Sequence, residues 1–186
     1  SCSFRDRSRG VAIEHTGYTT CESLTKAIEA KEYRTTLKDD AKVPFRFSEN
    51  VRTLGGGECT KCVVSFSSGY TYTYTYDEEN KVYPSSLNGK NFTDSEGTQQ
   101  SFTNVIVLYT TISSLNDAKG RVTFDLKEGK GKYFSNGTYE DITWKKGESA
   151  DMLQLYDAEG NDLLLNVGRS YIAFVDKSRE SVNTIS

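Results

Sequence analysis

One segment near the N-terminus, FRDRSRGVAIEHTGY, gathers groups that could bind an anion or transfer a proton. Its members are Arg5, Arg7, Arg9 and the single histidine of the chain, His15. Guanidinium groups bind phosphate or carboxylate through paired N–H donors, and an imidazole can act as general acid or base near neutral pH. The alternative is that Asp6 and Glu14 pair the arginines on a solvated loop. The segment is therefore a candidate ligand site, with His15 as its candidate catalytic residue.

A second candidate is an aromatic row in the segment GYTYTYTYD. In a strand, strict alternation places Tyr70, Tyr72, Tyr74 and Tyr76 on one face and the intervening threonines on the other. At about 3.3 Å per residue the row spans about 20 Å, which could stack several sugar rings or an extended peptide. The alternative is that the tyrosines pack against the inner face of a sheet.

Four cysteines in the first third of the chain could form disulfides or hold a metal: Cys2, Cys21, Cys59 and Cys62. Cys2–Cys21 with Cys59–Cys62 is one of three possible pairings. A four-thiolate zinc site normally has two closely spaced pairs, and only Cys59 and Cys62 have that spacing. A thioredoxin-like CxxC should open a helix, whereas the residues after Cys62 are typical of a strand. Disulfides, zinc and unpaired thiols remain open at this point.

The amino-acid composition limits the fold class and the function classes of the protein that carries these candidate residues. Twelve Tyr and nine Phe against two Pro, in 186 residues, favour a mainly β protein with a real core. The net charge of -3 argues against general binding to nucleic acid. No apolar run reaches the length of a membrane span, and no GxSxG, HExxH, Walker or Rossmann pattern is present. We expect no cofactor and no metal site.

Hydrophobic periodicity predicts one helix followed by an antiparallel sheet, an α+β fold that is mainly β with one packed helix. Thr19 and Glu22 form a capping box, which predicts a helix over about residues 20–32. Alternating apolar residues between turn signals predict the strands. These are 33–37, 43–47, 62–66, 70–76, 81–83, 104–111, 122–127, 132–134, 138–145, 153–156, 163–166 and 171–176. Trp144 should be a core residue on a central strand.

The chain is expected to divide near residue 60. Residues 1–60 are interpreted as the closing portion of a truncated upstream domain, and residues 61–176 as a β-rich domain with a meander or sandwich architecture. Residues 177–186 have little apolar content and are predicted to be a frayed tail.

A set of motifs resembles those of the YerB-like bacterial lipoproteins, a family built from domain of unknown function 3048 and a C-terminal companion domain. The C-terminal motifs are Tyr83, Asp94, Asn104-Val105-Ile106-Val107, Gly129-Lys130-Gly131, Phe134 with Asn136-Gly137, Thr143-Trp144-Lys145, Asp157-Ala158-Glu159-Gly160 and Leu165-Asn166-Val167-Gly168. Near the N-terminus, Phe4-Arg5-Asp6 with Arg9 resembles an Arg-containing run of the family. The segment from Glu14 to Thr19 resembles its Pro-His-Asn-x-Tyr-Thr motif, with Glu14 and Thr16 replacing Pro and Asn.

The resemblance implies a lipoprotein of Gram-positive bacteria on the extracellular face of the cytoplasmic membrane, anchored through residues absent from this chain. In that oxidising setting Cys2 and Cys21 should be bonded. The expected function is a non-enzymatic, extracytoplasmic binding or scaffold module of the cell envelope, whose partner is a cell-wall or other envelope component. The alternative is an envelope enzyme that acts on a phosphorylated or glycosidic polymer through the Arg/His cluster, completed by groups from a missing N-terminal half. A homodimer or a retained upstream fragment is expected to cover the N-terminal third.

Overall fold

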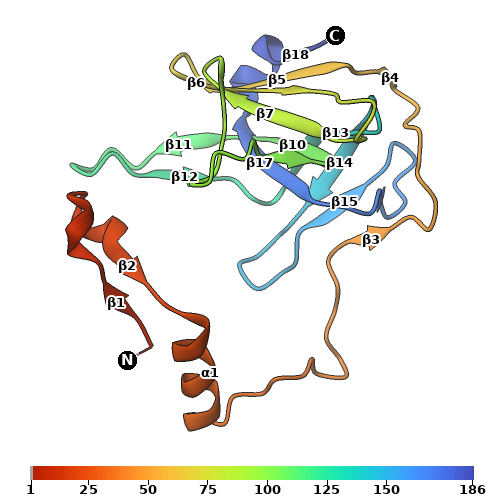
Figure 1. The fold of residues 1–186 in the computed structure, drawn as a ribbon. Coiled ribbons are helices and arrows are strands. Elements are labelled where there is room, and N and C mark those ends of the chain that lie inside the picture. The colour runs from red at the N-terminus through yellow and green to blue at the C-terminus, as the bar shows by residue number, and fades with distance from the viewer. Residues whose placement is uncertain (1) are drawn as a thin grey trace. The chain divides into compact units, whose positions relative to one another are not determined.

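A computed structural model describes residues 2–186, which form two compact units (Figure 1). The first unit extends to Lys42 and the second unit spans Val43–Ser186. Strands β3 (Arg46–Phe47) and β4 (Gly57–Glu58) pair with strands of the second unit. The division therefore lies at Lys42 and not at the expected residue 60, because residues 46–58 are tied to the β-rich unit by backbone hydrogen bonds.

The first unit consists of short local elements. Strand β1 (Phe4–Arg5) pairs antiparallel with β2 (Gly17–Tyr18), and 3₁₀ turns at Arg7–Arg9 and Ile13–Thr16 connect them. Helix α1 (Cys21–Ala30) confirms the predicted helix, but its cap is Thr20, whose hydroxyl accepts from the Ser23 N–H at 3.1 Å. The strand expected at residues 33–37 is absent, because no neighbouring strand pairs with it in the described residues.

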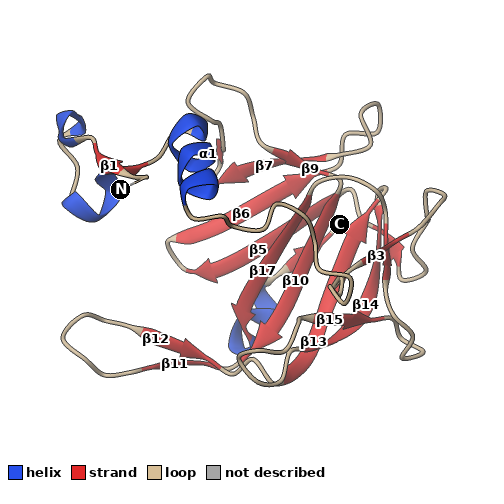
Figure 2. Cartoon of the chain, turned by 90° about the horizontal axis from the view of Figure 1, so that it is seen from below, coloured by secondary structure: helices blue, strands red, loops and turns tan. Residues whose placement is uncertain are grey.

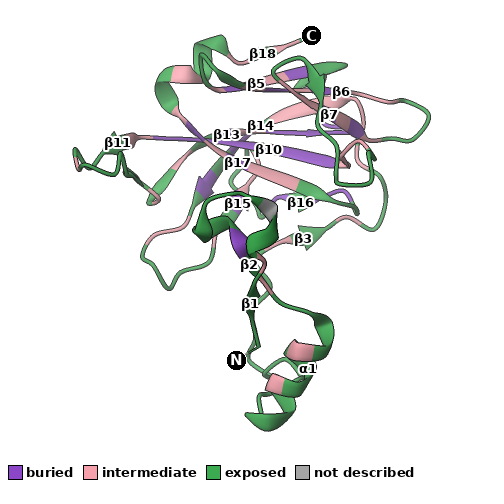
Figure 3. Ribbon diagram, turned by 60° about the vertical axis from the view of Figure 1, so that its left-hand side comes forward, coloured by how far each residue is buried: buried purple, intermediate pink, exposed green. Residues whose placement is uncertain are grey.

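Few side chains of the first unit are buried (Figure 3). Among its described side chains only Thr16 is buried, and α1 has no buried residue. Leu24 and Ile28, the apolar stripe of α1, are 44% and 37% exposed. The prediction of one helix is thus confirmed, whereas its expected burial against a sheet is not found within this unit.

The second unit contains two main sheets (Figure 2). The central sheet has the order β15 (Gln154–Tyr156), β14 (Thr138–Lys145), β13 (Glu128–Ser135), β10 (Asn104–Thr110) and β17 (Ser170–Asp176), with β4 also paired to β14. The outer sheet has the order β18 (Thr184–Ile185), β5 (Lys61–Ser67), β6 (Tyr70–Thr75), β7 (Tyr83–Leu87) and β8 (Lys90–Asn91), with β9 (Ser101–Phe102) paired to β7. Two smaller pairs are β11 (Ile112–Ser114) with β12 (Val122–Phe124), and β3 with β16 (Leu164–Leu165).

The central sheet is covered on both faces, which explains why β10 is buried at every residue. Val105 and Val107 belong to a cluster shared with β5 and β6 of the outer sheet. Ile106 and Leu108 belong to a second cluster on the opposite face, with Trp144 and residues of the connecting loops. A strand buried on both faces is a continuous apolar run instead of an alternating one. The mainly β, sandwich-type architecture is confirmed, and Trp144, 1% exposed, is a core residue as predicted.

Two features of the second unit differ from the sequence expectation. Strands β10 and β17 pair in parallel, across a long separation in the sequence. The tail is ordered, because residues Lys177–Val182 form a 3₁₀ turn and β18 pairs antiparallel with β5. The predicted fraying of residues 177–186 is therefore wrong.

The turn between β13 and β14 sets the register of the central hairpin. Asn136 and Gly137 have φ values of 51° and 69°, as a two-residue turn with two left-handed positions requires. Ser135 consequently lies opposite Thr138, and the ladder continues to Glu128 opposite Lys145. This register decides which side chains share each face of the hairpin.

Candidate functional site

In the Arg/His cluster, one of the cationic side chains that the structure describes is bound by the fold. One Arg5 guanidinium nitrogen donates to the Ile13 carbonyl and lies 3.4 Å from the Thr16 hydroxyl, so this side chain closes the loop between β1 and β2. Arg7 and His15 have exposed side chains. The side chain of Arg9 lies outside the described part of the structure. Anion binding by this cluster stays a prediction. Arg5 is less available as a donor for it, because its guanidinium is already bound within the protein.

The tyrosine row packs between the two sheets. Tyr72 and Tyr74 are 6% and 0% exposed, and the Tyr74 ring lies 5.6 Å from the ring of Tyr171 on β17. Tyr76 is half-buried and donates its hydroxyl to Asn136 Oδ1 at 3.1 Å, while Tyr70 remains 46% exposed. The expectation that the whole row stacks a ligand is corrected, because its two central rings build the core.

All four cysteines are free thiols, so the structure contains neither the expected Cys2–Cys21 disulfide nor the candidate Cys59–Cys62 pairing. Cys2 and Cys21 are exposed in the first unit, whereas Cys59 and Cys62 are buried in the cluster between the sheets. Burial raises the pKa of the Cys59 thiol to about 11 and raises the pKa of Cys62 further, with Cys59 as a smaller cause. Protonated, buried thiols are poor nucleophiles and poor metal ligands. Within residues 2–186, no three His, Cys, Asp or Glu side chains gather around a common point for a metal.

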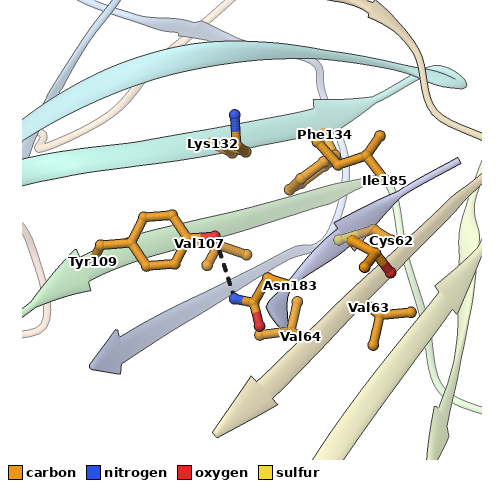
Figure 4. A pocket seen from close by; sticks show the side chains of 10 residues that line it. Cys62, Val63, Val64, Val107, Tyr109, Lys132, Phe134, Asn183 and Ile185 are labelled. Atoms are coloured by element: carbon orange, nitrogen blue, oxygen red, sulfur yellow. Dashed lines mark hydrogen bonds between the residues drawn. The ribbon is translucent and has the colours of Figure 1, made fainter. Parts of the chain in front are cut away.

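A small cavity beside Cys62 is lined by side chains of both sheets, among them Val64, Val107 and Phe134 (Figure 4). Its volume of about 10 Å³ is close to the minimum for a single water molecule. Lys132 and Asn183 lie on its wall, and Asn183 Nδ2 donates to the Tyr109 hydroxyl at 3.2 Å. We assign this cavity to imperfect packing between the sheets.

A larger hollow of about 400 Å³ lies over β13, β14 and β15, and we call it the hairpin groove. It is lined by Glu128, Gly129, Lys130, Thr143, Trp144, Lys145 and Tyr156. Lys130 lies opposite Thr143, Glu128 opposite Lys145, and Thr143 opposite Tyr156 on the next strand. Directly opposed residues point to the same face, so these five polar side chains form one surface.

Trp144 closes the bottom of the hairpin groove from the other face of the sheet. Its indole Nε1 donates to the Lys130 carbonyl at 3.0 Å, and its ring packs edge-on to Phe174. Gly129 lies opposite Trp144 in the ladder. A Cβ at residue 129 would come within 2.5 Å of the Tyr109 carbonyl oxygen and 2.8 Å of the indole nitrogen. The groove therefore rests on two strands and a large buried ring, which hold its polar groups in place.

The lysines of this face differ in their partners. Lys132 Nζ lies 2.5 Å from Asp141 and 5.3 Å from the centre of the Tyr139 ring. Lys130 and Lys145 are exposed, and neither has an acidic partner within 4.0 Å among the described residues. Two ammonium groups without partners can attract an anion from solution. Sequence reasoning missed both residues, although the Asn136-Gly137 turn already implies the register that brings them together.

A buried polar network lies on the opposite face of the hairpin. The hydroxyl of Tyr133 donates to Asn104 Oδ1 at 2.8 Å and accepts from the Asn166 N–H at 2.8 Å. Asn166 also accepts from the Arg52 N–H at 2.7 Å, which ties the loop before β4 to the end of β16. Each of these polar groups has a partner inside the protein, so the network is structural.

The network ends in a partly buried ion pair. Arg52 Nη1 lies 3.2 Å from Glu140 Oε1, and Arg52 Nη2 donates to Glu140 Oε2 at 3.3 Å. Burial raises the pKa of Glu140, while the charge of Arg52 opposes that rise. The guanidinium also donates to the Leu164 carbonyl, so it is occupied by the fold and not presented to a ligand.

Comparisons with known proteins match part of the second unit to a family and the whole chain to a solved structure. Residues 62–172 match the model of the C-terminal domain of a protein family of unknown function, DUF3048. The crystal structure of the YerB protein from Bacillus subtilis is similar over the whole chain, with a TM-score of 0.76 and 24% sequence identity. The chain spans 60% of that protein, and the similarity supports the fold. No curated protein matches the sequence. Within residues 2–186, no helix has the length and apolarity that a bilayer crossing requires.

Proposed function

The chain belongs to the DUF3048 family through its C-terminal domain at residues 62–172, and from this we propose that it is an extracytoplasmic binding or scaffold module of the cell envelope. It is placed by this proposal on the extracellular face of the cytoplasmic membrane, as part of a lipoprotein of a Gram-positive bacterium. Its partner is a component of the cell wall. The hairpin groove is the surface through which it binds.

The observation that carries the proposal is the contrast between the groove and the buried polar groups. Inside the second unit, ionisable and hydrogen-bonding side chains such as Arg52 and Glu140 are engaged with one another. In the groove, Lys130 and Lys145 lie without acidic partners on a surface that two strands hold in place. A rigid surface with exposed charges that lack a partner within the protein is suited to recognition.

An envelope enzyme acting through the Arg/His cluster is supported less well. Such an enzyme would need Arg5 to hold the substrate, but this guanidinium donates to the Ile13 carbonyl. Release of Arg5 would open the loop that carries His15. Binding through the hairpin groove needs no such rearrangement of the described residues, so it is the better supported function.

The test is retention on isolated cell envelopes of a Gram-positive bacterium. The purified chain should sediment with washed envelopes and stay in the supernatant with a matched cytosolic particulate fraction. Fractionation of cells that express the full-length protein should place it with the membrane, on a side accessible to added protease. Equal sedimentation with both fractions, or protection from protease in intact protoplasts, would contradict the proposal.

A further inference from the structure

We infer that the hairpin groove binds a phosphate-bearing polyol polymer, with the ammonium groups of Lys130 and Lys145 as its anion contacts. This inference rests on the proposed function, because it names the ligand class of the same surface. It is carried by the charges, the donors and acceptors, and the spacing of the groove residues.

The positive charge is placed by the hairpin register. Lys130 lies opposite Thr143 and Lys145 lies opposite Glu128, so the two lysines are diagonal neighbours on one face. Diagonal positions of an antiparallel pair are about 7–8 Å apart. Two long side chains at that spacing can meet successive anionic groups of one extended chain. The next lysine along β13 on this face, Lys132, is already neutralised by Asp141.

The remaining groups of the groove select a ligand that also carries hydroxyl groups. Glu128 offers a carboxylate acceptor beside Lys145, and Thr143 offers a hydroxyl between the two lysines. Tyr156 lies beside Thr143 on β15 and adds a half-buried ring that can contact the carbon backbone of the polymer. A purely anionic chain would be repelled by Glu128, whereas a polyol hydroxyl can donate to it. Phosphates joined by a polyol satisfy both requirements.

The net charge of -3 of the whole chain does not oppose this assignment. At physiological ionic strength the Debye length is about 8 Å, so distant surface charges are screened from the groove. Each exposed lysine contributes little on its own. A polymer gains affinity by repeating the contact along its length, because a second attachment occurs at high effective concentration.

The test measures binding of the full chain to a synthetic glycerol phosphate oligomer of defined length by titration calorimetry. The wild type should bind, and the double variant Lys130→Ala with Lys145→Ala should lose about tenfold in affinity, which corresponds to about 1.4 kcal/mol. Lys90→Ala is the matched control, because Lys90 is exposed on β8 in the outer sheet. Replacement of both groove lysines by arginine should retain binding, since the charge is kept.

Two further ligands test the chemical class. An uncharged polyol of the same length should not bind, and a polyglutamate of equal charge should bind more weakly because it lacks hydroxyl donors. Absence of wild-type binding, equal binding by the alanine double variant, or equal affinity for polyglutamate would overturn the inference. Thermal unfolding of each variant should match the wild type, which separates lost binding from lost folding.

Failure of this inference can be told from failure of the proposed function. If the alanine double variant still sediments with envelopes as the wild type does, the ligand class is wrong and envelope binding stands. If the wild type binds the oligomer but no envelope fraction, the groove chemistry stands and the proposed function is wrong.

Discussion

The two units of the chain contain similar apolar residues but use them differently. In the second unit, two clusters on the faces of the central sheet bury aromatic and aliphatic side chains, with Trp144 and Tyr74 almost fully inaccessible. In the first unit, Phe4, Ile13 and Leu24 are each at least 44% exposed. An amphipathic pattern specifies a helix or a strand. A hydrophobic core also needs apolar side chains from distant segments that pack against it. The comparison predicts that perturbations of the second unit will be costly and equivalent ones in the first unit will not.

The largest effect is expected from Trp144→Ala. The indole is buried, packs edge-on to Phe174 and donates to the Lys130 carbonyl, so its loss leaves a cavity and an unmet acceptor. The free energy of unfolding should fall by about 3–5 kcal/mol, measured by urea denaturation with circular dichroism. Tyr33→Ala is the counterpart in the first unit, where the ring is 63% exposed. It should change the same quantity by less than about 0.5 kcal/mol. Equal losses in the two variants would contradict the comparison.

The reactivity of the four cysteines measures the accessibility of side chains in both units in one experiment. At pH 8, Cys2 and Cys21 should react with iodoacetamide in the native protein because they are exposed. Cys59 should react at least about 100-fold more slowly, since a pKa of about 11 lies about two units above its ordinary value and the thiol is also buried. Cys62 should be slower still. Mass spectrometry with single Cys→Ser variants assigns each rate.

Two outcomes of that labelling would revise the comparison. Rapid modification of all four thiols would show that the core between the sheets opens readily. Only two modifiable thiols after unfolding without a reductant would restore the Cys2–Cys21 disulfide expected from the sequence. In that case a covalent bridge, and not a core, would hold the first unit together, and its reduction would loosen that unit alone.

Local signals in the sequence predicted local structure well. The Asn136-Gly137 turn fixes a register within a few residues of itself, and the capping signal before α1 predicted the helix, although the capping residue is Thr20 and not Thr19. The periodicity around Trp144 likewise gave the face of its strand. The parallel pairing of β10 with β17 and the docking of β18 on β5 were missed, because they depend on contacts between distant segments.

The candidate site was harder to predict than the fold for the same reason. The alternation of Tyr70 to Tyr76 predicts a row of rings, but the burial of its two central rings, Tyr72 and Tyr74, depends on Tyr171 of the central sheet. Lys130 differs from Lys132 in the residue that lies opposite it, which is Thr143 for Lys130 and Asp141 for Lys132. A lysine is available to a ligand when no acidic side chain pairs with it in the fold, and a local sequence motif does not show this.

A smaller effect is expected in the pH dependence of stability. Burial raises the pKa of Glu140 above its ordinary value of 4.5, with Arg52 opposing the rise. The folded protein therefore binds more protons than the unfolded chain between pH 4.5 and that raised pKa, and the free energy of unfolding falls as pH rises through this window. One group can contribute at most about 1.4 kcal/mol per pH unit.

The comparison of wild type with Glu140→Gln isolates that contribution. The stability of the wild type relative to the variant should decrease as the pH is raised from 4 to 7, measured by urea denaturation at each pH. Glu22→Gln is the control in the first unit, because Glu22 lies on exposed α1 in an i,i+4 pair with Lys26. Its profile should follow the wild type. A relative stability that rises with pH would mean that the attraction of Arg52 outweighs burial at Glu140.

The smallest effect on stability is expected from the apolar stripe of α1. Leu24 and Ile28 are half-exposed and α1 has no buried side chain, so replacing both by serine should change the free energy of unfolding of the monomer by about 0.5 kcal/mol or less. Glu29→Ala on the polar face of α1 is the control.

The same variants test the homodimer expected from the sequence. If a second copy covers the stripe, the light-scattering mass of the wild type will rise with concentration while that of the serine variant stays monomeric. A stripe that no second copy covers would give equal masses for the two proteins at all concentrations, and the homodimer expectation would then be wrong.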